Sequence, residues 1–198
     1  MKYSLLPSGD SAYLIDFGLD NTDMVWCESL NSIDGVSDVV PGANTILVRF
    51  NPLVVTSIES SIDNCLISAS KQTNTNTQIV EIPVIYNGED LDSVAKLTGL
   101  DITKVIELHS NSLYTVSFLG FSPGFAYLKG LNPLLYCPRL SIPRTSVPKG
   151  AVAIADRYSA IYPTSSPGGW NLIGVTKKEV FDNNGPLLTP GTTVRFVA

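Results

Sequence analysis

At 198 residues, with 44% hydrophobic and 16% charged residues, the chain is expected to fold into one domain or two small ones. Its net charge of −5 argues against nucleic acid or an anionic membrane as the main partner, because both favour clustered lysine and arginine. No apolar run approaches the roughly 20 residues of a membrane span, and the start of the sequence lacks the pattern of a signal peptide. We therefore expect a cytoplasmic protein.

The sequence offers little material for a metal site. It has three cysteines and one histidine, and Cys27, Cys65 and Cys137 lack the spacing of metal ligands. We expect no bound metal, and we expect the thiols to be reduced and structural.

The first 70 residues repeat one pattern, two strands followed by a helix. Turn residues separate the strands, and apolar residues at helical spacing predict the helices. The order ββαββα is typical of an antiparallel sheet with both helices on one face, which is a two-layer α+β domain. The predicted segments are Tyr3–Leu6, Ala12–Phe17, a helix capped by Thr22, Val36–Val40, Thr45–Phe50 and a helix over about Thr56–Ala69.

A polar segment, KQTNTNTQ at 71–78, is the clearest linker. It divides the chain into an N-terminal α+β domain over 1–78 and a second domain over 79–198. After one strand and two short helices, the second domain consists mainly of short strands, which indicates a closed or nearly closed β barrel. Its expected elements are the strand Ile79–Ile85, the helices Leu91–Leu97 and Ile102–His109, and the strands Leu113–Leu119, Ala151–Ala155, Tyr158–Tyr162, Trp170–Ile173 and Thr193–Phe196.

Two loops of the second domain combine turn residues with aromatic residues. In GFSPGF at 120–125, Pro123 sets φ and Gly124 permits a positive φ. In SSPGGW at 165–170, paired glycines after a proline allow backbone N–H groups to converge on an anion or a carbonyl. Either loop could instead be a hydrophobic turn, and Trp170 could simply pack. Neither GxxxxGK[ST] nor GxGxxG occurs, so no ATP site is predicted in this chain.

Arg139 and Arg144 each follow a proline. A guanidinium on a stiffened backbone loses less freedom when it binds a carboxylate or a phosphate. The alternative for each arginine is an ion pair with an acid of its own domain. Two arginines five residues apart favour an anionic ligand.

His109 is expected at the C-terminal end of a helix. It could act as a general acid or base. It could equally interact with the last carbonyl groups of the helix.

Four stretches of the second domain resemble the signature of a known family, the 5-oxoprolinase B-subunit family. They are GFSPGFAYLKGL (120–131), PRLSIPRTSVPKGAVAIA (138–155), IYPTSSPGGW (161–170) and LIGVT (172–176). Gly9-Asp10, Val40-Pro41-Gly42 and Leu47–Pro52 fall where the family has similar elements, so the resemblance covers nearly the whole chain. The family includes the sporulation kinase inhibitor KipI and proteins called allophanate hydrolase subunit 1.

The resemblance implies a cyclophilin-like β barrel after the α+β domain. It also implies work beside the A and C subunits in cleaving 5-oxoproline to glutamate at the expense of ATP, which the complex would bind. On chemical grounds, an arginine could bind the carboxylate of this lactam, and loop N–H groups could polarise its ring carbonyl. The catalytic candidates are His109, Arg139 and Arg144, and the substrate-binding candidates are Phe121, Pro123, Gly124, Phe125, Tyr127, Ser166, Pro167, Gly168, Gly169, Trp170 and Thr176.

The chain departs from the family pattern at three places near the candidate site. Val175 stands where the family usually has an arginine, and Asp156–Ala160 reads DRYSA where the family usually has glycines and a glutamine. Gly150-Ala151-Val152 stands where the family prefers Gly-Ser-Val. These departures make a binding role more plausible. The alternatives are therefore a KipI-like inhibitor that binds a sensor histidine kinase, or a carboxyltransferase component of a urea carboxylase-type system.

Overall fold

The computed structural model describes residues 3–18, 25–55, 57–69 and 79–198. Chain contacts divide the protein into two compact units, Met1–Asn76 and Thr77–Ala198. The division falls two residues before the boundary that the polar segment predicts. None of the described helices is long and apolar enough to cross a membrane.

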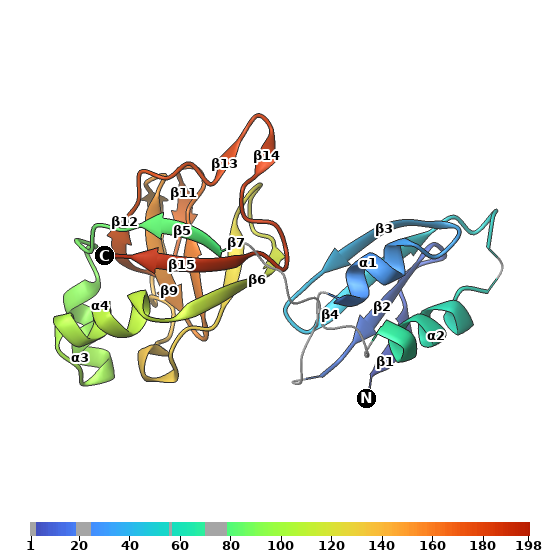
Figure 1. Cartoon of the computed structure of the whole chain (residues 1–198), viewed down its shortest axis with the longest axis horizontal. Coiled ribbons are helices and arrows are strands. Elements are labelled where there is room, and N and C mark those ends of the chain that lie inside the picture. The colour runs from blue at the N-terminus through green and yellow to red at the C-terminus, as the bar shows by residue number, and fades with distance from the viewer. Residues whose placement is uncertain (1–2, 19–24, 56, 70–78) are drawn as a thin grey trace. The chain divides into compact units, whose positions relative to one another are not determined.

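The N-terminal unit is an antiparallel sheet with two helices packed against it (Figure 1). The strand order is β1-β2-β4-β3. Apolar residues at every second position of β2 and β4, such as Ile46 and Val48, pack against Trp26, Leu30 and Ile62 of the helices. Thr22, the predicted cap of the first helix, lies outside the described residues, as does residue 56. In chain order the elements are β1 (Ser4–Pro7), β2 (Ala12–Asp16), α1 (Val25–Asn31), β3 (Val36–Pro41), β4 (Thr45–Phe50) and α2 (Glu59–Ala69).

The C-terminal unit is built on a seven-stranded sheet in the order β12-β9-β10-β7-β6-β15-β5. Neighbours are antiparallel except β15 and β5, which are parallel. Two further strand pairs, β8–β11 and β13–β14, stand apart from this sheet. The elements are β5 (Ile79–Pro83), α3 (Leu91–Thr98), α4 (Ile102–Ser110), β6 (Leu113–Leu119), β7 (Ala126–Lys129), the 3-10 turn η1 (Pro133–Leu135), β8 (Arg144–Val147), β9 (Ala151–Ala155), β10 (Tyr158–Ile161), β11 (Ser166–Gly168), β12 (Asn171–Val175), β13 (Phe181–Asp182), β14 (Gly185–Pro186) and β15 (Thr193–Val197).

The seven-stranded sheet curls until its two outer strands meet (Figure 1). The contact is a bridge between Ile85, just after β5, and Val175 in β12. Each of these residues donates its N–H to the carbonyl of the other at 2.9 Å. Val175, one of the departures from the family pattern, therefore lies in the bridge that joins the sheet edges.

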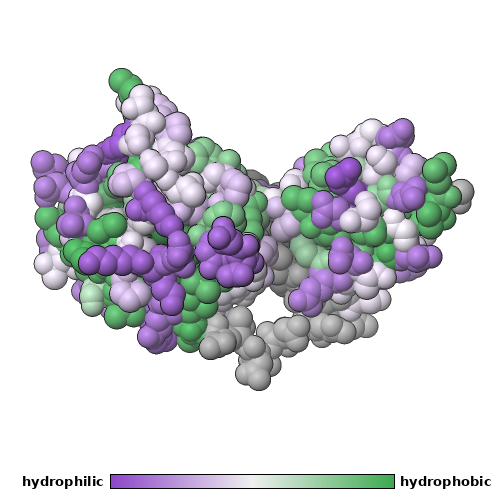
Figure 2. Space-filling model, turned by 90° about the horizontal axis from the view of Figure 1, so that it is seen from above, coloured by the Kyte–Doolittle hydropathy of each residue, from purple (hydrophilic) through white to green (hydrophobic). Residues whose placement is uncertain are grey.

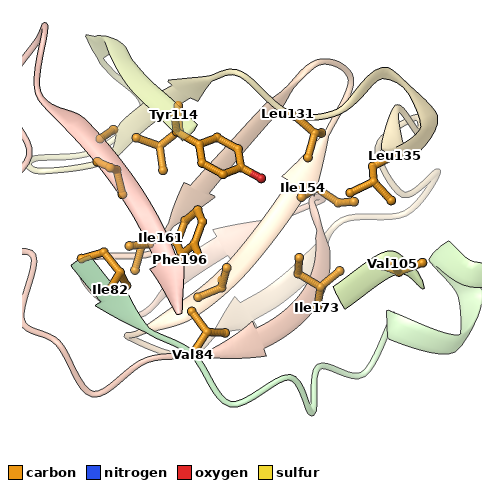
Figure 3. Close-up of a cluster of buried hydrophobic side chains, with 14 of the residues drawn as sticks. Ile82, Val84, Val105, Tyr114, Leu131, Leu135, Ile154, Ile161, Ile173 and Phe196 are labelled. Atoms are coloured by element: carbon orange, nitrogen blue, oxygen red, sulfur yellow. The ribbon is translucent and has the colours of Figure 1, made fainter. Parts of the chain in front are cut away.

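The interior of the curled sheet holds the main core of this unit. Tyr114 of β6 and Phe196 of β15 are buried there and meet edge to face, with 5.1 Å between ring centroids. Figure 3 shows side chains from several strands pointing into this space, together with Val105 of α4. α3 and α4 add Leu91, Val94 and Val105 to the same core, which accounts for the apolar spacing of both helices.

The opposite face of the sheet carries a second, smaller core. It contains the alanines of β9, together with Phe125, Tyr162 and Trp170. The β8–β11 pair contributes Val147 to this core. Phe125, Tyr127 and Trp170, three of the residues that the sequence singles out, belong to this second core.

Candidate functional site

Six aromatic side chains form one cluster on the face of the sheet opposite the main core. Phe125 meets Tyr162 and Trp170 edge to face, with ring centroids 5.1 Å and 5.5 Å away. Tyr127 stacks on Phe118 at 4.2 Å, and Tyr158 meets both of these rings edge on. We call this set, Phe118, Phe125, Tyr127, Tyr158, Tyr162 and Trp170, the aromatic cluster.

Alternation of side chains along the strands places most of the cluster on this face, and a shift of register between Val116 and Phe118 turns Phe118 to it as well. In β7, Ala126 and Leu128 belong to the main core, whereas Tyr127 between them belongs to the opposite face. In β9, the alanines at every second position lie on the same face as the rings. Their small side chains leave room for the aromatic cluster to pack against the sheet.

The GFSPGF loop brings two phenylalanines to the cluster at different depths. Phe125 is buried, whereas Phe121 is 61% exposed although it contacts Phe125 edge to face. Phe121 also has a φ of 69°, a left-handed conformation that a residue with a bulky side chain rarely adopts. Gly124 has a φ of +78°, and a Cβ there would lie 2.6 Å from the Phe181 ring. Pro123 is exposed on this loop. Strained backbone with an exposed ring is a feature of binding loops.

Arg139 lies at the edge of the aromatic cluster. Its Cζ is 5.9 Å from the centroid of the Trp170 ring, which is a cation–π distance. Its Nε lies 3.4 Å from Asp156 Oδ2, and both side chains are 57% exposed. An exposed ion pair of this kind is weak, so the Arg139 guanidinium is accessible to a ligand.

A buried amide helps to hold the segment before Arg139, which also pairs with Asp156 through the Cys137 carbonyl. Asn171 Nδ2 donates to the carbonyl oxygen of Pro138 at 2.9 Å and to that of Ile154 at 3.3 Å. It also lies 3.3 Å from Cys137 Sγ. Asn171 is only 1% exposed, so water does not compete for these bonds.

Arg144, in contrast, is paired with two carboxylates. Its Nη2 donates to Asp90 Oδ1 at 2.7 Å, and its Nε lies 3.3 Å from Glu89 Oε2. The hydrogen bond to Asp90 is the main cause of the raised pKa of Arg144. The ion-pair alternative for the two arginines is thus confirmed, with Asp156 for Arg139 and with Asp90 and Glu89 for Arg144.

The positive charges of the arginines act on two tyrosines of the cluster, Tyr127 and Tyr162. Burial raises the pKa of Tyr162 and of Tyr127, and the positive charge of Arg139 opposes the rise at both phenols. Arg144 also opposes it at Tyr162. Both cations therefore lie near Tyr162, and both tyrosines are neutral hydrogen-bonding groups at physiological pH.

The TSSPGGW stretch forms β11 and the turn that leads into Trp170. Gly168 packs so closely on Tyr162 that a Cβ there would lie 2.1 Å from the phenol oxygen. Gly169 accepts a hydrogen bond from the N–H of Leu140 at 2.7 Å. Ser166 Oγ is buried, and the described residues give it no hydrogen-bond partner. Pro167 between them is exposed.

His109 lies in the main core and not in the aromatic cluster. It is fully buried, with Nδ1 2.8 Å from the Tyr86 hydroxyl and Nε2 2.9 Å from Ser159 Oγ. Its ring packs against Phe196, with 4.5 Å between centroids. Burial lowers the pKa of His109 to about 3, which makes the imidazole neutral at physiological pH. A catalytic role for His109 stays a prediction, and this geometry supports a structural one.

The structure thus brings together most, but not all, of the candidates from the sequence. The GFSPGF loop, Arg139, Arg144, Tyr127 and the Ser166–Trp170 stretch lie on or beside the aromatic cluster. Thr176 lies elsewhere, in a turn where its N–H donates to Gly150 at 2.8 Å and its side-chain oxygen accepts from Lys178. Phe118, Tyr158 and Asp90 belong to the site although the sequence did not single them out. Asp90 could have been noticed in the sequence only because it stands next to Glu89 in a chain with few charged residues.

The described residues contain no group of three or more His, Cys, Asp or Glu side chains that could hold a metal ion. All three cysteines are free. Burial raises the pKa of Cys27 and of Cys137 to about 11, so these thiols are poor nucleophiles. The chemistry available at the aromatic cluster is therefore cationic and hydrogen-bonding: guanidinium groups, phenols and a hydroxyl beside an apolar surface.

Comparison with known proteins identifies the family. Residues 3–189 match the carboxyltransferase domain, subdomain C and D, and the chain belongs to this family. Among its relatives is the B subunit of 5-oxoprolinase from Bacillus subtilis (strain 168), 34% identical over all of this chain and 93% of the relative. The protein of the same name from Haemophilus influenzae is 37% identical and covers 98% of this chain and 97% of the relative. That of Escherichia coli O157:H7 is 40% identical over 87% of this chain and 84% of the relative.

Solved structures show the same fold. The crystal structure of TTHA0988 superposes with a TM-score of 0.80 at 34% identity over 94% of this chain, which spans 40% of the length of TTHA0988. The uncharacterized protein PH0987 from Pyrococcus horikoshii is 36% identical, with a TM-score of 0.58 over 98% of this chain and 96% of its own. The K. lactis urea amidolyase has a TM-score of 0.72 at 19% identity, over 98% of this chain and 15% of its own, and that likeness concerns the fold alone.

Proposed function

We propose that this chain is the B subunit of an ATP-dependent 5-oxoprolinase, which converts 5-oxo-L-proline to L-glutamate together with the A and C subunits. The observation that carries the proposal is the identity of 34–40%, over most of both chains, with three relatives that bear the name of the 5-oxoprolinase B subunit. The proposal includes a cytoplasmic location. It also includes the finer fold: a two-layer ββαββα domain followed by a cyclophilin-like barrel.

The aromatic cluster suits a small ring that carries a carboxylate. In the proposed complex Arg139 binds the carboxylate of 5-oxoproline, because its guanidinium is accessible and its bond to Asp156 is weak. The rim of the aromatic cluster, next to the half-buried Tyr127, accepts the apolar part of the ring. Phe121, exposed on the strained loop, contacts a partner protein or the ring itself.

In this proposal the complex, and not this chain alone, binds ATP. This chain has neither of the glycine-rich phosphate motifs. The partner subunits therefore supply the nucleotide site, while this chain supplies part of the substrate site.

The exposed hydrophobic residues of the C-terminal unit, such as Ile142 at 82% and Phe121 at 61% exposure, are available for contact with a partner. Figure 2 shows hydrophobic and hydrophilic residues interspersed over the visible face of both units.

The proposal is tested by reconstituting the three subunits and measuring 5-oxoproline-dependent ATP hydrolysis and glutamate formation. We expect both activities to require this chain. Unchanged activity in a mixture that omits the chain contradicts the proposal. An intact reaction would also leave the KipI-like role without support, whereas inhibition of a sensor histidine kinase by an inactive mixture would favour it.

Arg139 gives a sharper test of the same proposal. We expect Arg139→Gln to lower kcat/KM for 5-oxoproline by about tenfold or more, since a charge-assisted hydrogen bond contributes about 1.5–3 kcal/mol. The matched control is Arg195→Gln, which removes an arginine from the exposed pair with Glu81 on β5 and should leave kcat/KM unchanged. Equal kinetics for the two variants would show that Arg139 does not bind substrate.

A further inference from the structure

The described neighbours of the Arg144 guanidinium bind Nε and Nη2 but leave the Nη1 group without a partner. Nε faces Glu89 at 3.3 Å and Nη2 donates to Asp90 at 2.7 Å. Nη1 is buried, and the described residues provide no hydrogen-bond partner for it. A buried donor without a partner is costly, and such a group in a native structure calls for an explanation, of which a catalytic role is one.

Asp90 is itself fixed on both oxygens. Oδ1 accepts from Arg144, and Oδ2 accepts from the N–H of Leu172 in β12 at 2.7 Å. The Asp90 N–H returns a bond to the Leu172 carbonyl at 2.9 Å. Asp90 is 7% exposed, so it has little room to move. The carboxylate therefore holds Arg144 in one orientation against the edge of the main sheet.

The net charge around Arg144 determines which kind of acceptor can bind its Nη1 group. Arg144 carries one positive charge and faces two carboxylates, so the group of three is negative overall. A further carboxylate would be repelled there, whereas a neutral carbonyl oxygen accepts the bond without that penalty. Arg139 faces a single, exposed carboxylate at 3.4 Å and is better suited to an anion.

We propose that Arg144 Nη1 donates to a neutral amide carbonyl of the ligand, and that Asp90 is the positioning residue that holds this donor in place. In the proposed 5-oxoprolinase the acceptor is the ring carbonyl of the lactam, and this identity rests on the proposed function. The hydrogen bond draws electron density toward the carbonyl oxygen and makes the ring carbon more electrophilic. The backbone brings both arginines to the same pair of glycines, since Arg144 pairs with Gly168 and Leu140, next to Arg139, donates its N–H to Gly169.

The test compares two ring compounds that differ in the amide group. 5-Oxo-L-proline has the carboxylate, the ring carbonyl and the ring N–H, whereas cyclopentanecarboxylate has only the carboxylate. Their dissociation constants are measured by NMR titration on the full chain, alone and mixed with the A and C subunits. We expect Arg144→Gln to weaken binding of 5-oxo-L-proline about tenfold, the value of one hydrogen bond to a charged group, and to leave cyclopentanecarboxylate unchanged.

Arg139→Gln should behave differently, because the carboxylate is common to both compounds. We expect both dissociation constants to rise together, with their ratio preserved. Asp90→Asn should reproduce the effect of Arg144→Gln, and Asp90→Glu should restore part of the preference for 5-oxo-L-proline. If Asp90 has only a structural role, Asp90→Asn should weaken the binding of both compounds to the same extent. That result overturns its assignment as a positioning residue.

Asp90 is buried, and a variant that fails to fold would give no binding data. Glu89→Gln avoids this problem, because the Glu89 side chain is 77% exposed. Removing its charge makes the group of three neutral, so we expect cyclopentanecarboxylate to bind more tightly and the preference for 5-oxo-L-proline to fall. An unchanged preference in both Glu89→Gln and Arg144→Gln overturns the proposal.

The two proposals fail in distinguishable ways. One outcome is that the three-subunit mixture hydrolyses ATP with 5-oxoproline while Arg144→Gln leaves the preference for 5-oxo-L-proline over cyclopentanecarboxylate unchanged. In that case the assignment of Arg144 is wrong and the proposed function stands. If the mixture is inactive but the preference depends on Arg144, the proposed function is wrong and the carbonyl-binding role stands.

Discussion

His109 shows at the scale of one residue how burial decides what a side chain can do. Both ring nitrogens are occupied by hydroxyl groups, from Tyr86 and Ser159, and aromatic rings surround the imidazole. The Tyr114 hydroxyl donates to the backbone carbonyl of His109 at 2.9 Å, which ties the end of α4 to β6. The imidazole therefore links a helix to the strands of the main core as a neutral group.

This arrangement predicts a specific loss of stability in acid. The pKa of His109 is about 3 in the folded chain, against an ordinary value of 6.5. The unfolded chain therefore binds one more proton between these values, and stability present above pH 6.5 is lost as the pH falls toward 3. We expect His109 alone to lower the free energy of unfolding by about 2 kcal/mol between pH 7 and pH 5, from 1.36 kcal/mol per pH unit.

Urea unfolding at several pH values measures this effect. The sequence contains one histidine, so His109→Gln removes the only imidazole and should flatten the pH dependence between 5 and 7. Carboxyl groups titrate lower and are common to both proteins. If the two curves run parallel over this range, the imidazole is not buried as a neutral group.

Gly168 provides a second prediction at the same scale. A Cβ at this position would lie 2.1 Å from the Tyr162 hydroxyl, so Gly168→Ala must displace β11 or the phenol. We expect the free energy of unfolding to fall by about 1–3 kcal/mol, the usual cost of overpacking. The control is Gly120→Ala, where the nearest atom would lie at an ordinary 3.6 Å. Thermal unfolding compares the two, and equal midpoints would contradict the close contact.

At the scale of elements, β12 is the strand on which the site depends. Its first residue, Asn171, holds the segment that carries Arg139, and its second, Leu172, holds Asp90 and through it Arg144. One strand of the main sheet thus positions the backbone before Arg139 and the guanidinium of Arg144, although neither arginine belongs to that sheet. Changes in β12 should affect the ligand preferences of both arginines.

Asn171→Leu tests this dependence. The substitution removes the amide donor and leaves the carbonyls of Pro138 and Ile154 without that partner in a buried place, at a cost of about 1–3 kcal/mol. We also expect weaker binding through Arg139, because the segment before it loses one of its attachments. Urea unfolding and the cyclopentanecarboxylate titration measure the two effects, with the exposed Asn111→Leu as control. Lost stability with unchanged binding would show that Arg139 is positioned by other contacts.

The strands that the sequence did not reveal explain the limits of prediction at this scale. The strands Leu113–Leu119 and Ala151–Ala155 follow from apolar runs, and their bounds were predicted correctly. β8 and β11 contain or border the prolines and glycines that usually end a strand, and they pair only with each other across a long separation in the chain. β7 gives no clear signal in the sequence because it is four residues long and follows a Pro-Gly turn.

The residues of the candidate site that lie close together in the sequence could be predicted. The distant residues that they contact in the fold could not. Arg139, Arg144 and the two loops stand out through proline, glycine and aromatic residues near one another in the sequence. Asp90 lies 54 residues before Arg144, and only the fold brings the two together. For His109, a position at the end of a helix suggests exposure, whereas the curled sheet encloses this helix end.

At the scale of the molecule, each unit has its own core. The buried cluster of the N-terminal unit draws only on residues 15–66, and the two clusters of the C-terminal unit draw only on residues 82–196. Among the described residues, no buried cluster combines side chains from both units. Cores that are separate in this way allow each unit to fold by itself.

We therefore expect a fragment of residues 77–198 to fold without the rest of the chain. Its urea transition should be cooperative, and its dissociation constant for 5-oxo-L-proline should equal that of the full chain. Circular dichroism and the same NMR titration check both points. A fragment that is unfolded in native buffer would show that the C-terminal unit depends on contacts with residues 1–76.

The parallel pairing of β15 with β5 has a consequence for synthesis on the ribosome. β5 is the first strand of the C-terminal unit to be made, yet its neighbour in the sheet is the last, since β15 lies between β5 and β6. The N-terminal unit can fold as soon as it emerges, because its pairings are all local to its own residues. The C-terminal sheet must wait for residues 193–197, so β5 leaves the ribosome exit tunnel unpaired. Pro83 in β5 lacks an N–H donor, which disfavours pairing of this exposed strand with other nascent chains.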